Sequence, residues 1–194
     1  MDSNRDNIVL VFLFGVLLVT LIGLFASIKV AKTGHAGDMR TTPSQVKIKA
    51  FVAIAMSDNL SQGIDFGEVE TLPVFLNGTA NYNGTDQSGY YISVSKDSNK
   101  RADFCLNASR LDTDTGEEIG LGNYTWSNSS VTDITSPSLN NRVAFTETPV
   151  KGAFDVDKGT DQYFRFWLNI TDAQPGLYNN SVSFIAVPTG TSCI

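Results

Sequence analysis

An apolar run near the start of the chain constrains the fold more than any other feature. The residues from Ile8 to Ile28 carry no charge and are almost all apolar. A helix of about 21 residues spans about 31 Å, which matches the hydrocarbon core of a bilayer. We therefore predict a hydrophobic helix within residues 1–32 that needs surroundings free of water, either lipid or a bundle of like helices.

Two glycines interrupt this run, and small residues let neighbouring helices approach closely. If copies of the chain bundle through the run, large apolar side chains and these glycines make the contacts. We expect the contact residues to be Leu10, Phe14, Gly15, Leu17, Leu18, Leu21, Gly23 and Phe25. The predicted partners are then other copies of the chain, with a membrane holding the run before assembly.

A cleaved secretory signal is a competing interpretation of the same run. Such a signal has an apolar region of only about 7–15 residues and a small-x-small cleavage site. The run is longer, Leu24 blocks a site after Ala26, and Lys29 blocks one after Ala31. A site after Ala36 stays open, although it lies far from the apolar residues.

The charges around the run give a conflicting signal about orientation. Lys29 and Lys32 follow it, and the positive-inside rule would hold that side in the cytoplasm. The cysteines and glycosylation motifs described below favour the outside. We give these more weight, because two lysines are a weak orientation signal.

Glycines and a Thr-Thr-Pro sequence predict a break after the run, so we interpret residues 33–45 as a hinge and residues 46–194 as one extracytoplasmic domain. From Val46 to Met56 apolar residues alternate strictly, which is typical of a strand. Further strands are predicted at Tyr90–Ser95, Asp103–Asn107, Ile119–Leu121, Tyr124–Trp126, Val143–Thr146, Tyr163–Ile170 and Asn180–Val187. The predicted fold class is mainly β: an N-terminal hydrophobic α-helix followed by an immunoglobulin-like antiparallel β-sandwich.

The chain has two cysteines, Cys105 and Cys193. An even number of cysteines in an exported chain favours a disulfide. We predict that the two form one, with two buried free thiols as the alternative.

Glycosylation motifs are more frequent than chance predicts. The motif Asn-x-Ser/Thr occurs at Asn59, Asn77, Asn83, Asn107, Asn123, Asn128, Asn169 and Asn179. Random placement of the 15 asparagines and 36 serines and threonines would give about three. The excess indicates an exported surface with N-linked glycans, although these residue types are also common in turns. Asn169 lies inside a predicted strand and is the weakest candidate.

Catalytic and nucleic-acid-binding functions find no support in the sequence. His35 is the only histidine and lies in the predicted hinge, which leaves no Ser-His-Asp or Cys-His arrangement. A net charge of −6 without a basic stripe argues against nucleic acid. Acidic residues from Asp112 to Glu118 resemble the start of a calcium loop, but its required glycine and terminal glutamate are missing, so we predict a solvated hairpin turn. We expect no enzymatic activity, no metal, no small-molecule substrate and no cofactor other than glycans.

The layout resembles that of archaeal type IV filament subunits, the archaeal pilins and archaellins. The shared features are the uncharged apolar run, the short hinge and the domain rich in Ser, Thr and Asn. The domain itself is similar to secreted archaeal immunoglobulin-like domains in the segments Ile64–Gly67, Gly120–Trp126, Phe164–Leu168 and Pro175–Tyr178. The resemblance implies an extracellular filament, used for adhesion or motility, with the run in its core.

Two other functions remain open at the level of sequence. The chain could be a membrane-anchored surface-layer or adhesin-like glycoprotein that does not polymerise. It could also be a secreted filament protein whose Val46–Met56 strand inserts into the sheet edge of a neighbour after removal of a signal.

Overall fold

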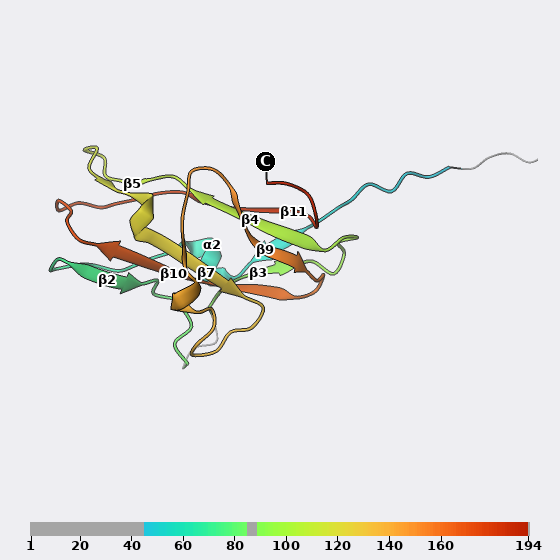
Figure 1. The fold of residues 1–194 in the computed structure, drawn as a ribbon, viewed down its shortest axis with the longest axis horizontal. Helices are drawn as coiled ribbons and strands as arrows, with labels where there is room; N and C mark the ends of the chain where they lie inside the picture. Colours follow the sequence, from blue (N-terminus) through green and yellow to red (C-terminus); the bar gives the residue numbers. More distant parts are fainter. Residues whose placement is uncertain (1–44, 85–88, 194) are drawn as a thin grey trace, which may run out of the picture. The chain divides into compact units, whose positions relative to one another are not determined.

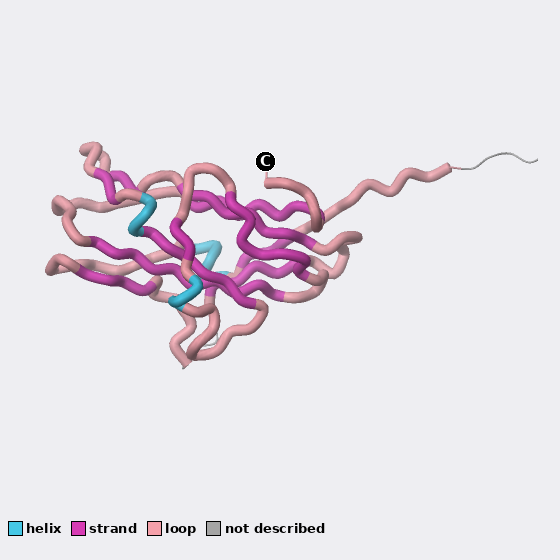
Figure 2. The backbone as a smooth tube through the Cα atoms, viewed as in Figure 1, coloured by secondary structure: helices cyan, strands magenta, loops and turns pink. Residues whose placement is uncertain are grey.

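The computed structural model describes residues 45–84 and 89–193. The packing reported below is that of residues 48–194, one of the two units into which the chain divides. The predicted N-terminal helix, its eight contact residues and most of the predicted hinge lie outside the described residues. The described part is mainly β, and its longer strands form two antiparallel sheets (Figures 1 and 2).

The larger sheet is built around β10 (Asp161–Ile170), the longest strand. Its order is β1 (Ile54–Met56), β3 (Tyr90–Val94), β10, β7 (Tyr124–Ser129) and β8 (Val143–Ala144), and β2 (Val74–Asn77) also pairs with β10. β3 pairs with the first half of β10 and β2 with the second half, so the two strands follow each other along the same side of β10.

A side chain fills the gap that β2 and β3 leave along β10. The backbone N–H of Phe166 donates to Asn81 Oδ1 at 2.9 Å, and Asn81 Nδ2 donates to the Phe166 carbonyl at 2.7 Å. The Gly78 N–H donates to the same carbonyl at 2.9 Å. A buried backbone amide needs such partners, so Asn81 replaces a missing ladder residue.

The smaller sheet has three strands in the order β11 (Val182–Pro188), β4 (Ala102–Ala108) and β9 (Val150–Val156). β9 is irregular: its register with β4 shifts twice, and Asp155 has a φ of 54°. A separate hairpin joins β5 (Leu111–Asp112) to β6 (Glu118–Ile119).

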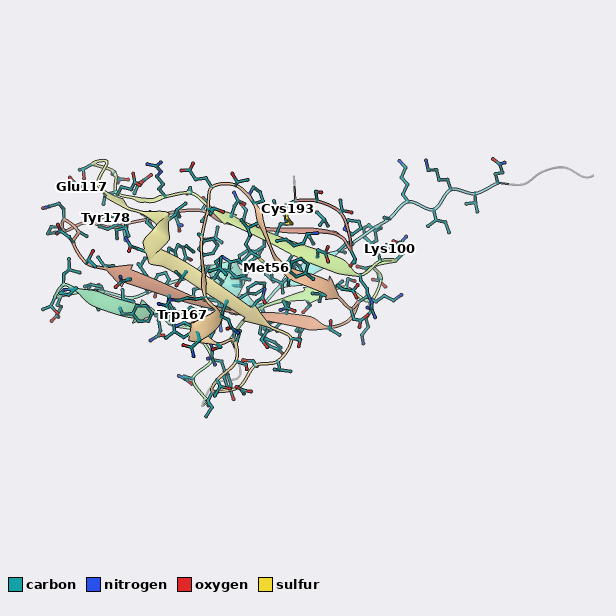
Figure 3. The ribbon with its side chains drawn as sticks, in the orientation of Figure 1. Met56, Lys100, Glu117, Trp167, Tyr178 and Cys193 are labelled. Carbon is teal, nitrogen blue, oxygen red and sulfur yellow. A yellow bond between two sulfur atoms is a disulfide. The ribbon has the colours of Figure 1, made fainter. Side chains whose placement is uncertain are left out.

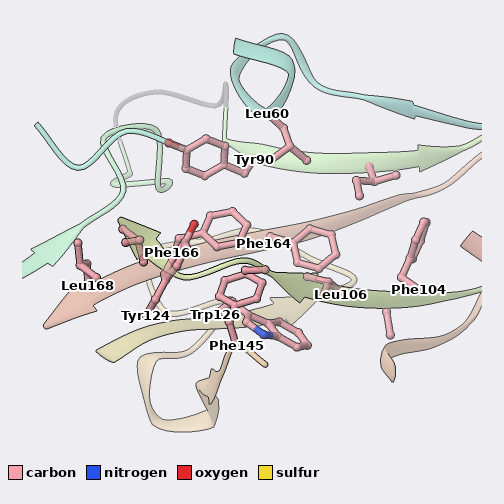
Figure 4. Packing of buried hydrophobic residues seen from close by; sticks show 14 of the residues in the cluster. Leu60, Tyr90, Phe104, Leu106, Tyr124, Trp126, Phe145, Phe164, Phe166 and Leu168 are labelled. Carbon is pink, nitrogen blue, oxygen red and sulfur yellow. The ribbon is translucent and has the colours of Figure 1, made fainter. Parts of the chain in front are cut away.

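Aromatic side chains from both sheets form the core between them (Figure 4). Phe164 and Phe166 of β10 face Phe184 of β11, with ring centroids of Phe164 and Phe184 5.5 Å apart in an edge-to-face arrangement. Phe104 of β4 is fully buried. Leu60 lies above Tyr90 at one side of this core. Phe164, Phe166, Leu168 and Ile170, at alternate positions of β10, all belong to this core.

Helices are few in the described residues. α2 (Asp58–Gln62) has five residues and buries Leu60. Ser57 is its N-cap, and the Ser57 Oγ accepts from the Leu60 N–H. Two short 3₁₀ turns, η1 (Leu121–Asn123) and η2 (Leu139–Asn141), complete the set. Within the part of the chain that the structure describes, no helix has the length and apolar character needed to cross a membrane.

The predicted fold class, an N-terminal hydrophobic helix followed by an immunoglobulin-like sandwich, is therefore wrong for this structure. The described chain is mainly β with one short α-helix, and its antiparallel sheets have six, three and two strands. The sequence pattern predicted eight extended segments, whereas the described residues form eleven strands, and it could not predict which strands pair with each other. Here β10 takes two successive strands on one side, which the alternation could not reveal.

Individual strand predictions had mixed success. The segments predicted near β3, β4, β7, β10 and β11 are strands within a few residues. The predicted strand Val46–Met56 is much shorter, because only β1 finds a partner. β2, β5 and β9 were missed.

Candidate functional site

The eight predicted glycosylation sites all lie at the surface. Asn77, Asn83 and Asn179 are exposed. The other five are half-buried, and none is fully buried: Asn59, Asn107, Asn123, Asn128 and Asn169. Asn169 lies in β10 on the face opposite the core, so its position in a strand does not hide it.

Two of these asparagines use the nitrogen to which a glycan would be attached. Asn128 Nδ2 donates to the Gly152 carbonyl at 2.7 Å, and this bond joins the two sheets. Asn107 Nδ2 donates to the Glu147 carbonyl at 3.0 Å. A glycan on either nitrogen would disturb these contacts, so Asn107 and Asn128 are poor acceptors in the folded domain. The sequence motif carries no sign of this difference.

Cys105 and Cys193 form a disulfide, as predicted, with an S–S distance of 2.00 Å and a sequence separation of 88. Cys105 lies on the outer face of β4 and is fully buried, because the segment after β11 crosses that face (Figure 3). Disulfides of this kind persist in oxidising compartments.

The buried carboxylate of Asp103 also holds the segment after β11. Asp103 Oδ2 accepts from Lys151 Nζ at 2.8 Å and from the Gly190 N–H at 3.0 Å, while Oδ1 accepts from the Asp155 N–H at 2.7 Å. Burial alone would raise the pKa of Asp103, but the hydrogen bond from Lys151 and the two backbone N–H groups lower it below its usual value. Sequence reasoning missed this residue, since a single Asp in a strand has no distinguishing spacing.

The outer face of the six-stranded sheet has a second buried charge. Arg165, only 8% exposed, projects from β10 and donates to the carbonyls of Asp133 and Pro137, the latter at 3.1 Å. These carbonyls belong to the loop between β7 and β8. Burial lowers the pKa of Arg165, and Asp133 and Tyr82 oppose that shift. Arg165 Nε has no hydrogen-bond partner.

An apolar groove lies between two parts of the chain. One is α2 together with the segment that follows it, and the other is the segment that leads into β11. We call this groove the edge groove; its volume is about 900 Å³, and its wall includes Leu60, Leu76, Leu111, Ile170, Val182 and Phe184. Asp65, Glu68 and Glu70 also line it. The sequence did not predict it, because its lining comes from segments that are far apart along the chain.

The acidic segment from Asp112 to Glu118 forms the predicted hairpin turn. The Thr113 N–H donates to the Glu117 carbonyl at 2.9 Å, and Gly116 has a φ of 88° that favours glycine. Among the described residues, no group of three or more His, Cys, Asp or Glu side chains is placed to hold a metal ion. His35 lies outside them.

Comparisons with protein-family models, curated proteins and solved structures find no match to this chain.

Proposed function

We propose that the chain is a structural subunit of an extracellular filament of the archaeal pilus or archaellum type, used for adhesion or motility. The observation that supports this most directly is the Cys105–Cys193 disulfide, which fits a domain exposed to an oxidising environment. Eight surface asparagines in glycosylation motifs support the same location. The fold adds a compact β domain suited to the outside of such a filament.

The apolar run from Ile8 to Ile28 is the proposed assembly segment. Before assembly it lies in the membrane, and in the filament it packs against the same run of other copies. Each large apolar side chain removed from water contributes about 1.5–3 kcal/mol. The run contains sixteen such residues, all of which would meet water if a copy left the filament, and this accounts for a durable polymer without any catalytic chemistry.

A charge inside the run tests this proposal. Leu18→Lys places an ammonium group among the packed copies, and we expect it to abolish fibres while the β domain stays folded. Ser3→Lys adds the same charge outside the run and should leave fibres intact. Assembly is read by electron microscopy and by sedimentation of detergent-free extracts, and folding by circular dichroism.

The main alternative is a single-pass surface-layer or adhesin-like glycoprotein. In that case the purified chain is a monomer that requires detergent, and Leu18→Lys impairs membrane retention without any fibre to lose. Normal fibres from Leu18→Lys would contradict assembly through the run.

A further inference from the structure

The edge strands of the two sheets differ in length and in charge. Among the described strands, β1, β2 and β8 are edge strands of two to four residues. β9 and β11 each have seven, but β9 carries Lys151 and Asp155 and an irregular register. Short, charged or bulged edges resist pairing with another strand. β11 has none of these protections, since no residue from Val182 to Val187 is charged.

The free side of β11 presents backbone groups for a further strand. Two hydrogen bonds show which residues of β11 bond to β4. The Ser109 N–H donates to the Ser181 carbonyl, and the Thr189 N–H donates to the Arg101 carbonyl. In an antiparallel pair, residues at every second position exchange both bonds with the partner strand. The backbone amides of Val182, Phe184 and Ala186 therefore point away from β4.

The core is incomplete under this edge. Phe104, Leu106 and Ala108 of β4 are 0–1% exposed, whereas their β11 partners Val182, Phe184 and Ala186 are all half-buried. Val182 and Phe184 also line the edge groove. A strand added here would cover both the amides and the apolar side chains.

The chain contains a segment with the matching pattern. Val46 is 86% exposed and Ile48 is 77% exposed, and residues 45–50 are all exposed and belong to no strand. In an extended conformation Val46, Ile48 and Ala50 share one face, and Lys47 and Lys49 occupy the other. With Val46 and Ile48 turned towards the groove, the two lysines face solvent on the outer side of the sheet and keep their hydration.

From these observations we infer that residues 45–50 of one copy add as a strand to β11 of a second copy, with Val46 and Ile48 in the edge groove. Donor and acceptor are different segments of the chain, so the contact is heterologous and can propagate from copy to copy. The inference rests on the proposed function in so far as copies meet outside the cell, and it supplies a second contact between them.

A peptide-binding experiment tests this contact. The acceptor is the full chain with Ile48→Asp, dispersed in detergent, and the probe is a peptide of residues 45–53. We expect saturable binding, with slowed hydrogen exchange at Val182, Phe184 and Ala186. A peptide with Ile48→Asp should bind at least about tenfold more weakly. A peptide with Gln45→Asp, which adds the same charge on the opposite face, should bind within about threefold of the unchanged peptide.

Two acceptor variants locate the contact on β11. Val182→Pro removes an amide that points away from β4, a position where proline is tolerated, and should abolish binding. Val182→Ala keeps that amide and should retain binding. If Val182→Pro fails to fold, hydrogen exchange in the Ile48→Asp acceptor gives the answer by itself. Absent binding, equal binding of the Ile48→Asp peptide, or unprotected β11 amides would overturn the inference.

Fibres separate this inference from the proposed function. Fibres whose β11 amides exchange as fast as in the dispersed chain would overturn strand addition and leave the filament proposal standing. Peptide binding with β11 protection, in a chain that forms no fibres, would support strand addition and count against the filament. Protection of the same amides in an isolated monomer would show that the chain's own segment fills the groove, which overturns the role of a second copy.

Discussion

The outer faces of the two sheets are covered in different ways. On the three-stranded sheet, the segment after β11 is attached by the Cys105–Cys193 disulfide and by the carboxylate of Asp103. On the six-stranded sheet, the loop between β7 and β8 is held through its backbone carbonyls by the guanidinium of Arg165. The first cover is covalent, and the second depends on hydrogen bonds from one buried side chain. In both covers a buried charged side chain of the outer face forms hydrogen bonds with the backbone of the covering segment.

Removal of the disulfide is the change with the largest expected effect. Cys105→Ala with Cys193→Ala should lower the free energy of unfolding by about 4–5 kcal/mol, because an 88-residue loop regains its freedom in the unfolded chain. Chemical denaturation measures the loss. Reductant should destabilise the unchanged protein and have no effect on the double variant; equal sensitivity of both would contradict the role of the disulfide.

Substitution of the buried arginine should have the next largest effect. Arg165→Met keeps much of the volume but leaves the carbonyls of Asp133 and Pro137 without their donor. We expect a loss of about 2–4 kcal/mol, since each buried unsatisfied group costs about 1–3 kcal/mol. Limited proteolysis should then cut within residues 131–142 sooner than in the unchanged protein. Cleavage elsewhere, with that loop still resistant, would show that other contacts hold it.

Acid sharpens the contrast, because Asp103 titrates and the disulfide does not. The pKa of Asp103 is lower in the folded protein than in the unfolded chain, so its stabilisation is complete above about pH 4 and is lost as the pH falls through the folded value. Asp103→Asn should cost about 1.5–3 kcal/mol at pH 7. Its loss relative to the unchanged protein should shrink as the pH drops below 4. A difference that stays constant from pH 7 to pH 2 would exclude the carboxylate as the cause.

The smallest expected effect concerns an exposed side chain of the arginine-held loop. Ile134 is 73% exposed, so Ile134→Ser should change the free energy of unfolding by less than about 0.5 kcal/mol. This variant is the matched control for Arg165→Met, since it alters the side chains of the loop and leaves its carbonyls. A loss comparable with that of Arg165→Met would mean that apolar contacts hold the loop after all.

Local patterns in the sequence predicted the inner strands well. The alternation of Phe164, Phe166 and Leu168 identifies the core face of β10, and the even number of cysteines led to the disulfide. β9 was missed because Gly152 and Asp155 interrupt its pattern. Gly152 is required there, since an added Cβ would lie 2.3 Å from the ring of Trp126.

Features that depend on distant partners were not predictable. Alternation from Val46 to Met56 shows that the segment suits a strand, but only β1 pairs with another strand, and Lys49, Phe51 and Ala53 bond to the loop that follows β3 instead. The edge groove and the cover over Arg165 depend on where loops end in space. Arg165 stands between Phe164 and Phe166 in a strand rich in aromatic residues, and this position was a sequence signal for that cover.

The hydrogen bond from Asn128 to the Gly152 carbonyl has a consequence for biogenesis. Once the two sheets have closed, an oligosaccharyltransferase can no longer reach this nitrogen without opening them. A sugar found on Asn128 would thus record that modification preceded folding, whereas exposed Asn77 and Asn179 can be modified at either stage. Site-by-site occupancy in the mature protein would then indicate the order in which export, folding and glycan transfer occur.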